Sequence, residues 1–314
     1  MSAMSAGAVG TGYADHLTDT DLSLLAAVGQ LARGSAADTA ASLRRHAEKL
    51  PELLADPRTF QAVFGPGDPT AGPGALASLA SPFLIFAVAV HAAAAELEST
   101  DHLPERLGPR QRVPLFDGPQ LRDFLGSPAR RLFLAELLAS FTRNRDGRYH
   151  EPAADAGGQQ PGMARRQPGY RGARRFSELD LPRMAGQLDD VAEADRPGVY
   201  RRLGDVALFL TGVFPDYAIT HELGPVNAAR LLRSAQVPAR QREELAAAPA
   251  IDLFEYLGAQ WYRAAWALAQ ARTARLAVVA EVADRFRQAR RVLNHIADGR
   301  LFASGDPWFA PPAR

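Results

Sequence analysis

Residues 81–97, SPFLIFAVAVHAAAAEL, form the most apolar stretch of the chain and decide its fold class. Ser81 and Pro82 form a helix start, because a serine hydroxyl can cap the first turn and proline fits the first helical position. From Phe83 to Leu97, apolar residues surround the helix axis instead of lining one stripe. A helix of this kind must be covered on all sides. We therefore predict that it lies at the centre of a helical bundle.

Elsewhere, apolar residues recur at three- and four-residue spacings, and alternating strand patterns are scarce. Asp19 or Asp21 can cap a helix that ends near Gly34, and Ser127 with Pro128 can start another. These signals predict an all-α multi-helix bundle of about 10–12 helices. The expected helices cover residues 19–34, 35–50, 51–64 (two short helices), 82–97, 128–145, 180–193, 197–213, 225–235, 239–247, 251–271 and 273–298.

The sequence divides into two helical halves. Residues 16–145 form the N-terminal half after a flexible tail of residues 1–15, and residues 177–300 form the C-terminal half before a tail of residues 301–314. Between the halves, residues 146–176 are rich in glycine, proline and arginine and lack an apolar pattern, which predicts a flexible basic insertion. The sequence leaves open whether the two halves share one core.

Composition excludes several kinds of chemistry. The 314 residues include no cysteine, which excludes disulfides, thiolate zinc sites, iron–sulfur clusters and a cysteine nucleophile. Lys49 is the only lysine and no G-x-x-x-x-G precedes it, so Schiff-base and P-loop roles are not expected. The formal net charge is +1, and 47% of the residues are apolar, which predicts a soluble protein with a sizeable core.

No segment predicts secretion or insertion into a membrane. Residues 1–16 lack the basic start and the long apolar stretch of a secretory signal. The longest apolar run, residues 83–95, has about 13 residues and contains His91, whereas a spanning helix needs roughly 20. We therefore expect a cytoplasmic protein without a membrane span.

Several ionisable side chains lie within apolar helical segments, where burial is costly unless they are paired. In one interpretation, some of them converge in a pocket between the 82–97, 128–145, 197–213 and 251–271 helices. The candidate pocket residues are His91, Glu136, Asp205, Glu255, Tyr262 and Trp266.

The alternative interpretation is that each of these groups is paired for structural reasons, for example Asp205 with Arg201 or Arg202 on its own helix. The Glu-x-x-His spacing of helix-bundle metal sites is absent from the sequence. No metal and no cofactor is therefore predicted. Gly258, in the aromatic segment 253–266, predicts a close approach of the helix that contains Gly204 and Gly212.

The predicted insertion is strongly basic. Residues 143–175 contain eight arginines against three acidic residues, with Tyr149 and Tyr170 available to stack on bases. Nucleic acid, acidic protein and anionic lipid are the candidate partners. A solvated insertion is the alternative, and the missing helix-turn-helix and RNA-module signatures favour it. The residues expected to contact an anionic partner are Arg165, Arg166, Arg171, Arg174 and Arg175.

Two segments, RRLGDVALFLTGVFPDY (201–217) and LFEYLGAQWYRAAW (253–266), resemble a group of uncharacterised all-helical bacterial proteins. The resemblance implies a helical fold and an actinobacterial source. It implies no activity and no functional residue.

No complete catalytic set is visible, so the preferred hypothesis is a non-catalytic interaction or regulatory protein that binds a protein partner or itself. The segment RLFASGDPWFAPPAR (300–314) favours it, because Trp308, Phe309 and their apolar neighbours must dock on this chain or on another. One alternative is a helix-bundle enzyme or a small-ligand or metal-binding protein with an interior histidine and carboxylate cluster. The other is nucleic-acid binding through residues 143–175.

Overall fold

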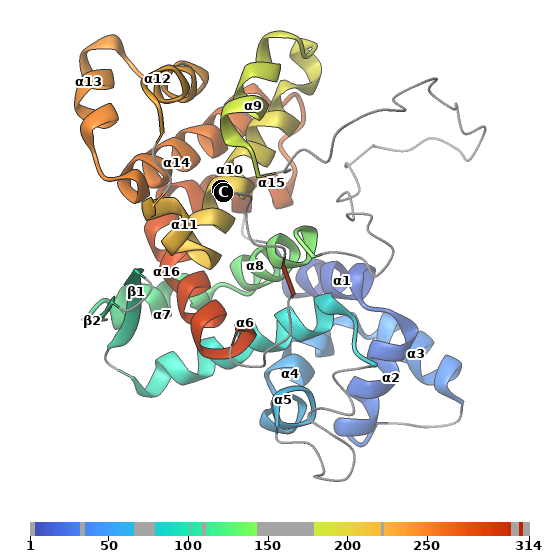
Figure 1. The fold of residues 1–314 in the computed structure, drawn as a ribbon. Coiled ribbons are helices and arrows are strands. Elements are labelled where there is room, and N and C mark those ends of the chain that lie inside the picture. The colour runs from blue at the N-terminus through green and yellow to red at the C-terminus, as the bar shows by residue number, and fades with distance from the viewer. Residues whose placement is uncertain are drawn as a thin grey trace, which may run out of the picture.

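The structure is a computed structural model that describes residues 4–31, 35–65, 79–100, 102–108, 111–142, 179–220, 223–302 and 308–309. These residues form sixteen α-helices and one two-stranded sheet, which confirms the predicted all-α class (Figure 1). The number of helices exceeds the predicted 10–12 because the expected helix over residues 273–298 is divided in two, and because helices also form at Ala6–His16, Gly118–Gly126 and Pro215–Thr220, where none was expected.

The α-helices are α1 (Ala6–His16), α2 (Asp19–Val28), α3 (Ala36–Arg45), α4 (Leu50–Ala55), α5 (Pro57–Phe64), α6 (Pro82–Ser99), α7 (Gly118–Gly126), α8 (Pro128–Ser140), α9 (Leu181–Gly186), α10 (Arg196–Val213), α11 (Pro215–Thr220), α12 (Pro225–Ser234), α13 (Ala239–Ala247), α14 (Ala250–Leu268), α15 (Ala274–Asp284) and α16 (Phe286–Ile296). Short 3₁₀ segments η1 (Ala47–Lys49), η2 (Gln187–Asp189) and η3 (Glu193–Asp195) and a π turn η4 (Ala297–Leu301) join or extend them. The strands are β1 (Leu103–Gly108) and β2 (Gln111–Leu115).

Helix α6 occupies the centre of the molecule, as the apolar stretch predicts. Every residue from Phe83 to His91 is buried, and α4, α5, α7, α8 and α16 contact the helix (Figure 1). By length and composition alone, α6 could cross a membrane. Its burial by the surrounding helices is typical of a core helix instead, and this is compatible with the expected absence of a membrane span.

The start of α6 is fixed by local hydrogen bonds. The Ser81 hydroxyl accepts a hydrogen bond from the Leu84 amide at 3.2 Å, and Pro82 occupies the first turn. The buried Asp21 carboxylate accepts a hydrogen bond from the Ser81 amide at 2.8 Å and so ties α2 to α6. Asp21 is not the cap of α2, because Thr18 caps that helix and Asp21 is its partner in a capping box.

The prediction of a flexible tail over residues 1–15 is wrong for most of that segment, because residues 6–16 form helix α1. Val9 and Tyr13 are buried in the core. A Cβ atom at Gly10 would lie 2.3 Å from the carbonyl oxygen of Ala47, so the glycine lets α1 contact the η1 backbone. Glycine and alanine give this helix little apolar patterning, which is why the sequence looks like a tail.

The antiparallel β1–β2 hairpin was not predicted. Pro104 lies opposite Pro114 in the ladder, and proline is unusual within paired strands. Both strands lie at an edge because the sheet formed by the described residues has two strands, so proline is tolerated there. The hairpin packs against α11 and α16.

In the C-terminal half, α10 and α14 form the main helix pair. A Cβ atom at Gly204 would lie 2.4 Å from the Tyr262 ring, and one at Gly258 would lie 3.1 Å from the Ala207 Cβ. The predicted close approach of these helices is therefore confirmed. The expected continuous helix over residues 273–298 is divided at Arg285 into α15 and α16, although no glycine or proline marks the break.

The apolar core is one contiguous cluster that includes side chains from both halves. The C-terminal tail is partly docked on this chain. Phe309 stacks on Phe86 of α6 at 5.5 Å between ring centroids and lies 5.0 Å from the Phe209 ring of α10. The predicted insertion of residues 146–176 lies outside the described residues.

Candidate functional site

The structure divides the six predicted pocket residues between three places. His91 and Glu136 lie among α1, α6 and α8, and Glu136 is close enough to influence Asp205, which pairs with Tyr262 between α10 and α14. Glu255 belongs to a separate ion-pair network. Trp266 lies near the end of α14, half-buried, with the Arg272 guanidinium 5.1 Å from its ring centroid.

His91 is a buried neutral histidine. The Arg131 guanidinium lies 3.3 Å from His91 Nδ1 and donates to it, so Nε2 carries the proton and donates to the Tyr13 hydroxyl at 3.0 Å. Burial lowers the pKa of His91 to about 3, and the positive charge of Arg131 acts in the same direction. Both ring nitrogens are thus engaged in hydrogen bonds within the protein.

Glu136 is also paired. Its Oε1 atom lies 3.0 Å from His16 Nε2 and 3.9 Å from the Arg275 guanidinium. His16 in turn packs against the Phe83 ring at 4.7 Å between centroids. The contact therefore joins α1 to α8 and α15, because its three members lie on these helices.

Asp205 and Tyr262 form a buried pair between α10 and α14. The Tyr262 hydroxyl donates a hydrogen bond of 2.8 Å to Asp205 Oδ1, while Arg201 lies 4.0 Å from Oδ2. Burial raises the pKa of the Asp205 carboxyl and that of the Tyr262 hydroxyl. The predicted partnership of Asp205 with Arg201 is present, but its direct hydrogen-bond partner is Tyr262.

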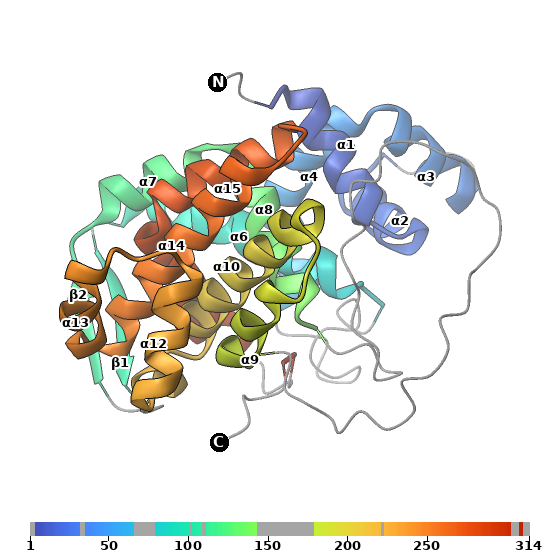
Figure 2. The same ribbon diagram turned by 90° about the horizontal axis from the view of Figure 1, so that it is seen from above.

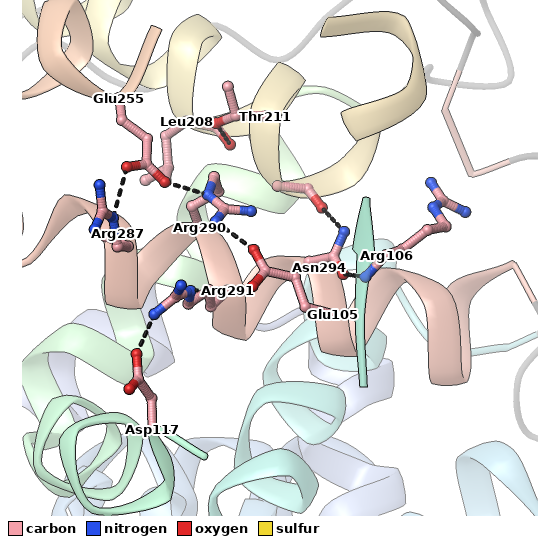
Figure 3. Close-up of polar contacts among 11 residues, drawn as sticks. Glu105, Arg106, Asp117, Leu208, Thr211, Glu255, Arg287, Arg290, Arg291 and Asn294 are labelled. Atoms are coloured by element: carbon pink, nitrogen blue, oxygen red, sulfur yellow. Dashed lines mark hydrogen bonds and ion pairs between the residues drawn. The ribbon is translucent and has the colours of Figure 1, made fainter. Parts of the chain in front are cut away.

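Glu255 lies in a network centred on Arg290 of α16 (Figure 3). The Arg290 guanidinium lies between Glu105 of β1 and Glu255 of α14 and pairs with both, and the side chains of all three are at most 8% exposed. On the outer side, Arg287 donates to Glu255 at 2.9 Å. This network joins the hairpin to α14 and α16.

Two further α16 residues extend the network toward the hairpin and α7. Arg291 pairs with Glu105 at 3.3 Å and with Asp117 just before α7 (Figure 3). The Asn294 side chain accepts a hydrogen bond from the Arg106 amide at 2.9 Å and donates one to the Gly212 carbonyl at 3.5 Å. Each of these side chains thus has at least one structural partner, although the buried Arg290 Nη1 and Arg291 Nε atoms have no hydrogen-bond partner.

In the part of the chain that the structure describes, the interior ionisable groups lie in separate pairs and networks instead of in one cluster. Among the described residues, no group of three or more histidine, aspartate or glutamate side chains could hold a metal ion. The carboxylates of Glu136, Asp205 and Glu255 face arginine, histidine or tyrosine partners within the protein. Their arrangement supports packing of the helices against one another.

A cleft of about 790 Å³ lies elsewhere, between α9, the start of α10 and α12. Figures 1 and 2 show α9 and α12 toward the outside of the molecule, with α10 running inward beside α9. The cleft is lined by Asp180, Pro182, Arg183, Ala185, Gly186, Leu188, Asp189, Arg196, Tyr200, Asn227, Arg230, Arg233, Ser234 and Gln236. None of the six predicted pocket residues is among them.

Arginine dominates the polar lining of the cleft. Arg230 and Arg233 lie on α12 and form no ion pair with any described residue. Arg196, at the start of α10, donates to the Val191 carbonyl at 3.4 Å. Tyr200 is only 6% exposed yet lines the cleft, and its hydroxyl makes no hydrogen bond to the described residues. Arg230, Arg233 and the Tyr200 hydroxyl therefore give the cleft positive charge and hydrogen-bond donors that no described residue occupies.

Sequence reasoning missed this cleft because its residues come from three separate segments, 180–189, 196–200 and 227–236. Each segment taken alone has the mixed polar composition of a solvated helix face. The segments meet only when α9 packs on α10 and α12. The basic residues singled out at 165–175 lie outside the described residues.

The chain matches no protein-family model, no curated protein and no solved structure.

Proposed function

We propose that this chain is a non-catalytic regulatory protein that binds a small anionic molecule in the cleft between α9, α10 and α12. The observation that supports the proposal is the pair Arg230 and Arg233, which line the cleft and have no acidic partner among the described residues. By contrast, Arg290 is enclosed between two carboxylates. An anion in the cleft would accept hydrogen bonds from the Arg230 and Arg233 guanidinium groups, which no acidic residue of the described chain pairs with.

The size and charge of the cleft agree with this function. Small-molecule sites usually occupy clefts of about 300–1,000 Å³, and this one measures about 790 Å³. Four arginines and two aspartates line it, so the lining has a positive excess. Arginine forms two parallel hydrogen bonds to carboxylate or phosphate groups, which favours binding of an anion over a neutral molecule.

The proposal is tested by the melting temperature of the protein in phosphate, sulfate and citrate at constant ionic strength. A ligand that binds only the folded state raises the melting temperature with concentration. We expect at least one of these anions to do so, and the double variant Arg230→Ala with Arg233→Ala to lose the effect. Arg240→Ala is the matched control, because Arg240 is an exposed arginine of α13 outside the cleft.

The proposal would be wrong if no anion stabilises the protein, or if the double variant responds as the unchanged protein does.

A second candidate is the binding of a protein partner or self-association, in the cytoplasm. The exposed apolar side chains Phe116 (73% exposed) and Val226 (70% exposed) favour it. The tail now supports it less, because Phe309 docks on this chain. Light scattering of the protein and of Phe116→Ser tests the candidate, since a monomer in both cases would argue against self-association.

Nucleic-acid binding through residues 143–175 remains a separate proposal, motivated by their arginines alone. Its test is the affinity for single-stranded DNA at increasing salt, with and without this segment. A steep salt dependence that disappears on deletion would support it.

A further inference from the structure

We infer that the ligand of the cleft is a phosphate monoester of a small, hydroxyl-rich molecule, with the phosphoryl group held by Arg230 and Arg233. The inference rests on the proposed function and adds the chemical class of the ligand. It depends on three observations: the spacing of the two arginines, the charge balance of the lining, and the polar character of the remaining lining residues.

The spacing favours one compact anionic group. Arg230 and Arg233 are three residues apart on α12, so their side chains leave the same face of the helix as neighbours. Arg230 also reaches across to α9, where a Cβ atom at Gly186 would lie 3.7 Å from its Cδ atom. Two adjacent guanidinium forks can share the three terminal oxygens of one phosphoryl group. A single carboxylate offers only two acceptor oxygens to the same pair.

The charge balance favours a single phosphoryl group. The lining contains Arg183, Arg196, Arg230 and Arg233 against Asp180 and Asp189, an excess of two positive charges. A phosphate monoester carries a charge of about −1.5 to −2 at neutral pH, which matches that excess. The two aspartates would repel a polyanion, so a polyphosphate or a nucleic-acid strand fits less well.

The rest of the lining favours an organic part that is rich in hydroxyl groups. Asp189, Asn227 and Gln236 offer acceptors and amide donors, and the Tyr200 hydroxyl lies among them without a described partner. The apolar lining is limited to small contributions from Pro182, Ala185 and Leu188. A lipid chain would find little apolar surface here, whereas a sugar or polyol could satisfy these polar groups.

Isothermal titration with glucose 6-phosphate, inorganic phosphate, glucose and gluconate at constant ionic strength tests the inference. We expect glucose 6-phosphate to bind at least about tenfold more tightly than inorganic phosphate or gluconate, and glucose alone to show no heat of binding. The double variant Arg230→Ala with Arg233→Ala should lose about 100-fold in affinity or more, because two charge-assisted contacts are removed. Arg240→Ala should bind as the unchanged protein does.

A second variant separates the two parts of the ligand. Asp189→Asn removes a negative charge from the cleft and an acceptor for ligand hydroxyls. We expect inorganic phosphate to bind this variant more tightly and glucose 6-phosphate to lose its advantage over inorganic phosphate. A uniform change for both ligands would contradict the assignment of the hydroxyl-binding side.

The outcomes distinguish this inference from the proposed function. If gluconate binds as tightly as glucose 6-phosphate, the phosphoryl assignment is overturned while anion binding stands. If inorganic phosphate binds as tightly as glucose 6-phosphate, the inference that the ligand has a hydroxyl-rich organic part is overturned. Tighter binding of a phosphoserine peptide than of glucose 6-phosphate would overturn the small-molecule source. If no anion binds, the proposed function fails as well.

Discussion

The arginines of this protein differ in their surroundings, as Arg290 on one side and Arg230 and Arg233 on the other illustrate. Arg290 has a 3% exposed side chain and is enclosed between Glu105 and Glu255, so its charge is compensated inside the protein. Arg230 and Arg233 face an open cleft and have no such compensation from the described residues. Residue type alone therefore does not indicate which arginines hold the fold and which can bind a ligand.

Replacement of Arg290 by alanine should strongly destabilise the protein. The change leaves two buried carboxylates without their shared cation, and breaking a buried ion pair in this way costs about 3–5 kcal/mol of unfolding free energy. Arg287→Ala is the control, because Arg287 pairs with the same Glu255 but its side chain is 58% exposed. For that variant we expect a loss below about 1 kcal/mol.

Urea unfolding of both variants measures the difference. Equal losses for Arg290→Ala and Arg287→Ala would contradict the central place of Arg290 in the network.

The stability of the protein should fall below neutral pH because of His91. The folded-state pKa of His91 is lowered to about 3, while an unfolded histidine has its ordinary value near 6.5. The stability contribution is therefore present above about pH 6.5 and is lost progressively as pH falls toward 3, since only the unfolded state takes up the proton in that window. Between pH 7 and pH 5 the loss due to this residue is about 2 kcal/mol.

Comparison of the unfolding free energy of the protein with that of His91→Gln at pH 7 and pH 5 checks this expectation, because other titrating groups cancel in the difference. The NMR signal of His91 in the folded protein provides a second measurement. A titration midpoint above pH 5 would contradict the buried neutral state.

At the residue scale, the sequence predicted which ionisable side chains are buried but not what they contact. Apolar neighbours correctly marked His91, Asp205 and Glu255 as buried, because the surrounding residues must lie in the core. Apart from the local pair Asp205 and Arg201, their partners could not be predicted, since Tyr13 is 78 residues away from His91 and Arg290 is 35 residues away from Glu255 along the chain. Only the packing of the helices brings such pairs together.

At the scale of elements, helix starts were easier to predict than helix breaks. Ser81 with Pro82 and Ser127 with Pro128 mark the starts of α6 and α8, because caps are local. The break at Arg285 and the β1–β2 hairpin have no comparable local signal. The hairpin is joined to α16 by Glu105 and by the Arg106 amide, which are long-range contacts.

The contact between α10 and α14 depends on glycine at a position where a side chain has no space. In Gly204→Ala, the new Cβ atom would lie 2.4 Å from the buried Tyr262 ring. We expect a loss of about 1–3 kcal/mol of unfolding free energy, because the ring must move within a packed core.

Gly198→Ala in the same helix is the matched control, because no atom lies within 4 Å of the added Cβ. That variant should be unchanged or stabilised by up to about 1 kcal/mol, since alanine favours the helix over glycine. Thermal unfolding of both variants decides the point, and equal behaviour would mean that the helices do not approach closely at Gly204.

At the scale of the whole molecule, one apolar core joins the two halves, and the cleft lies at its margin, where the core residues Ala185, Leu188 and Tyr200 form part of the lining. Helix α6 contributes to this core from the N-terminal half and α10 from the C-terminal half, and Phe309 bridges them near the end of the chain. The cleft is formed by α9, α12 and the start of α10, and Figures 1 and 2 show α9 and α12 toward the outside of the molecule. The interior polar network around Arg290 and the proposed ligand-binding arginines Arg230 and Arg233 therefore lie in different parts of the molecule.

This separation was beyond sequence-based prediction. The apolar sequence of α6 indicated the core. The polar residues that line the cleft have the composition of an ordinary solvated surface, and only the packing of α9 against α12 brings them together. The chain could be assigned to the all-α class from periodicity because periodicity reports burial. The proposed site could not be predicted in the same way, because its residues lie on three separate segments and no local pattern indicates that these segments meet.

The most direct test of this account compares two sets of arginine variants by melting temperature with and without glucose 6-phosphate. Arg290→Lys should melt at a lower temperature but keep the full rise caused by the ligand, because it alters the interior network alone. The double variant Arg230→Ala with Arg233→Ala should melt as the unchanged protein does without ligand and show no rise with it. If Arg290→Lys loses the ligand effect, or the double variant keeps it, the separation of structural and ligand-binding arginines is contradicted.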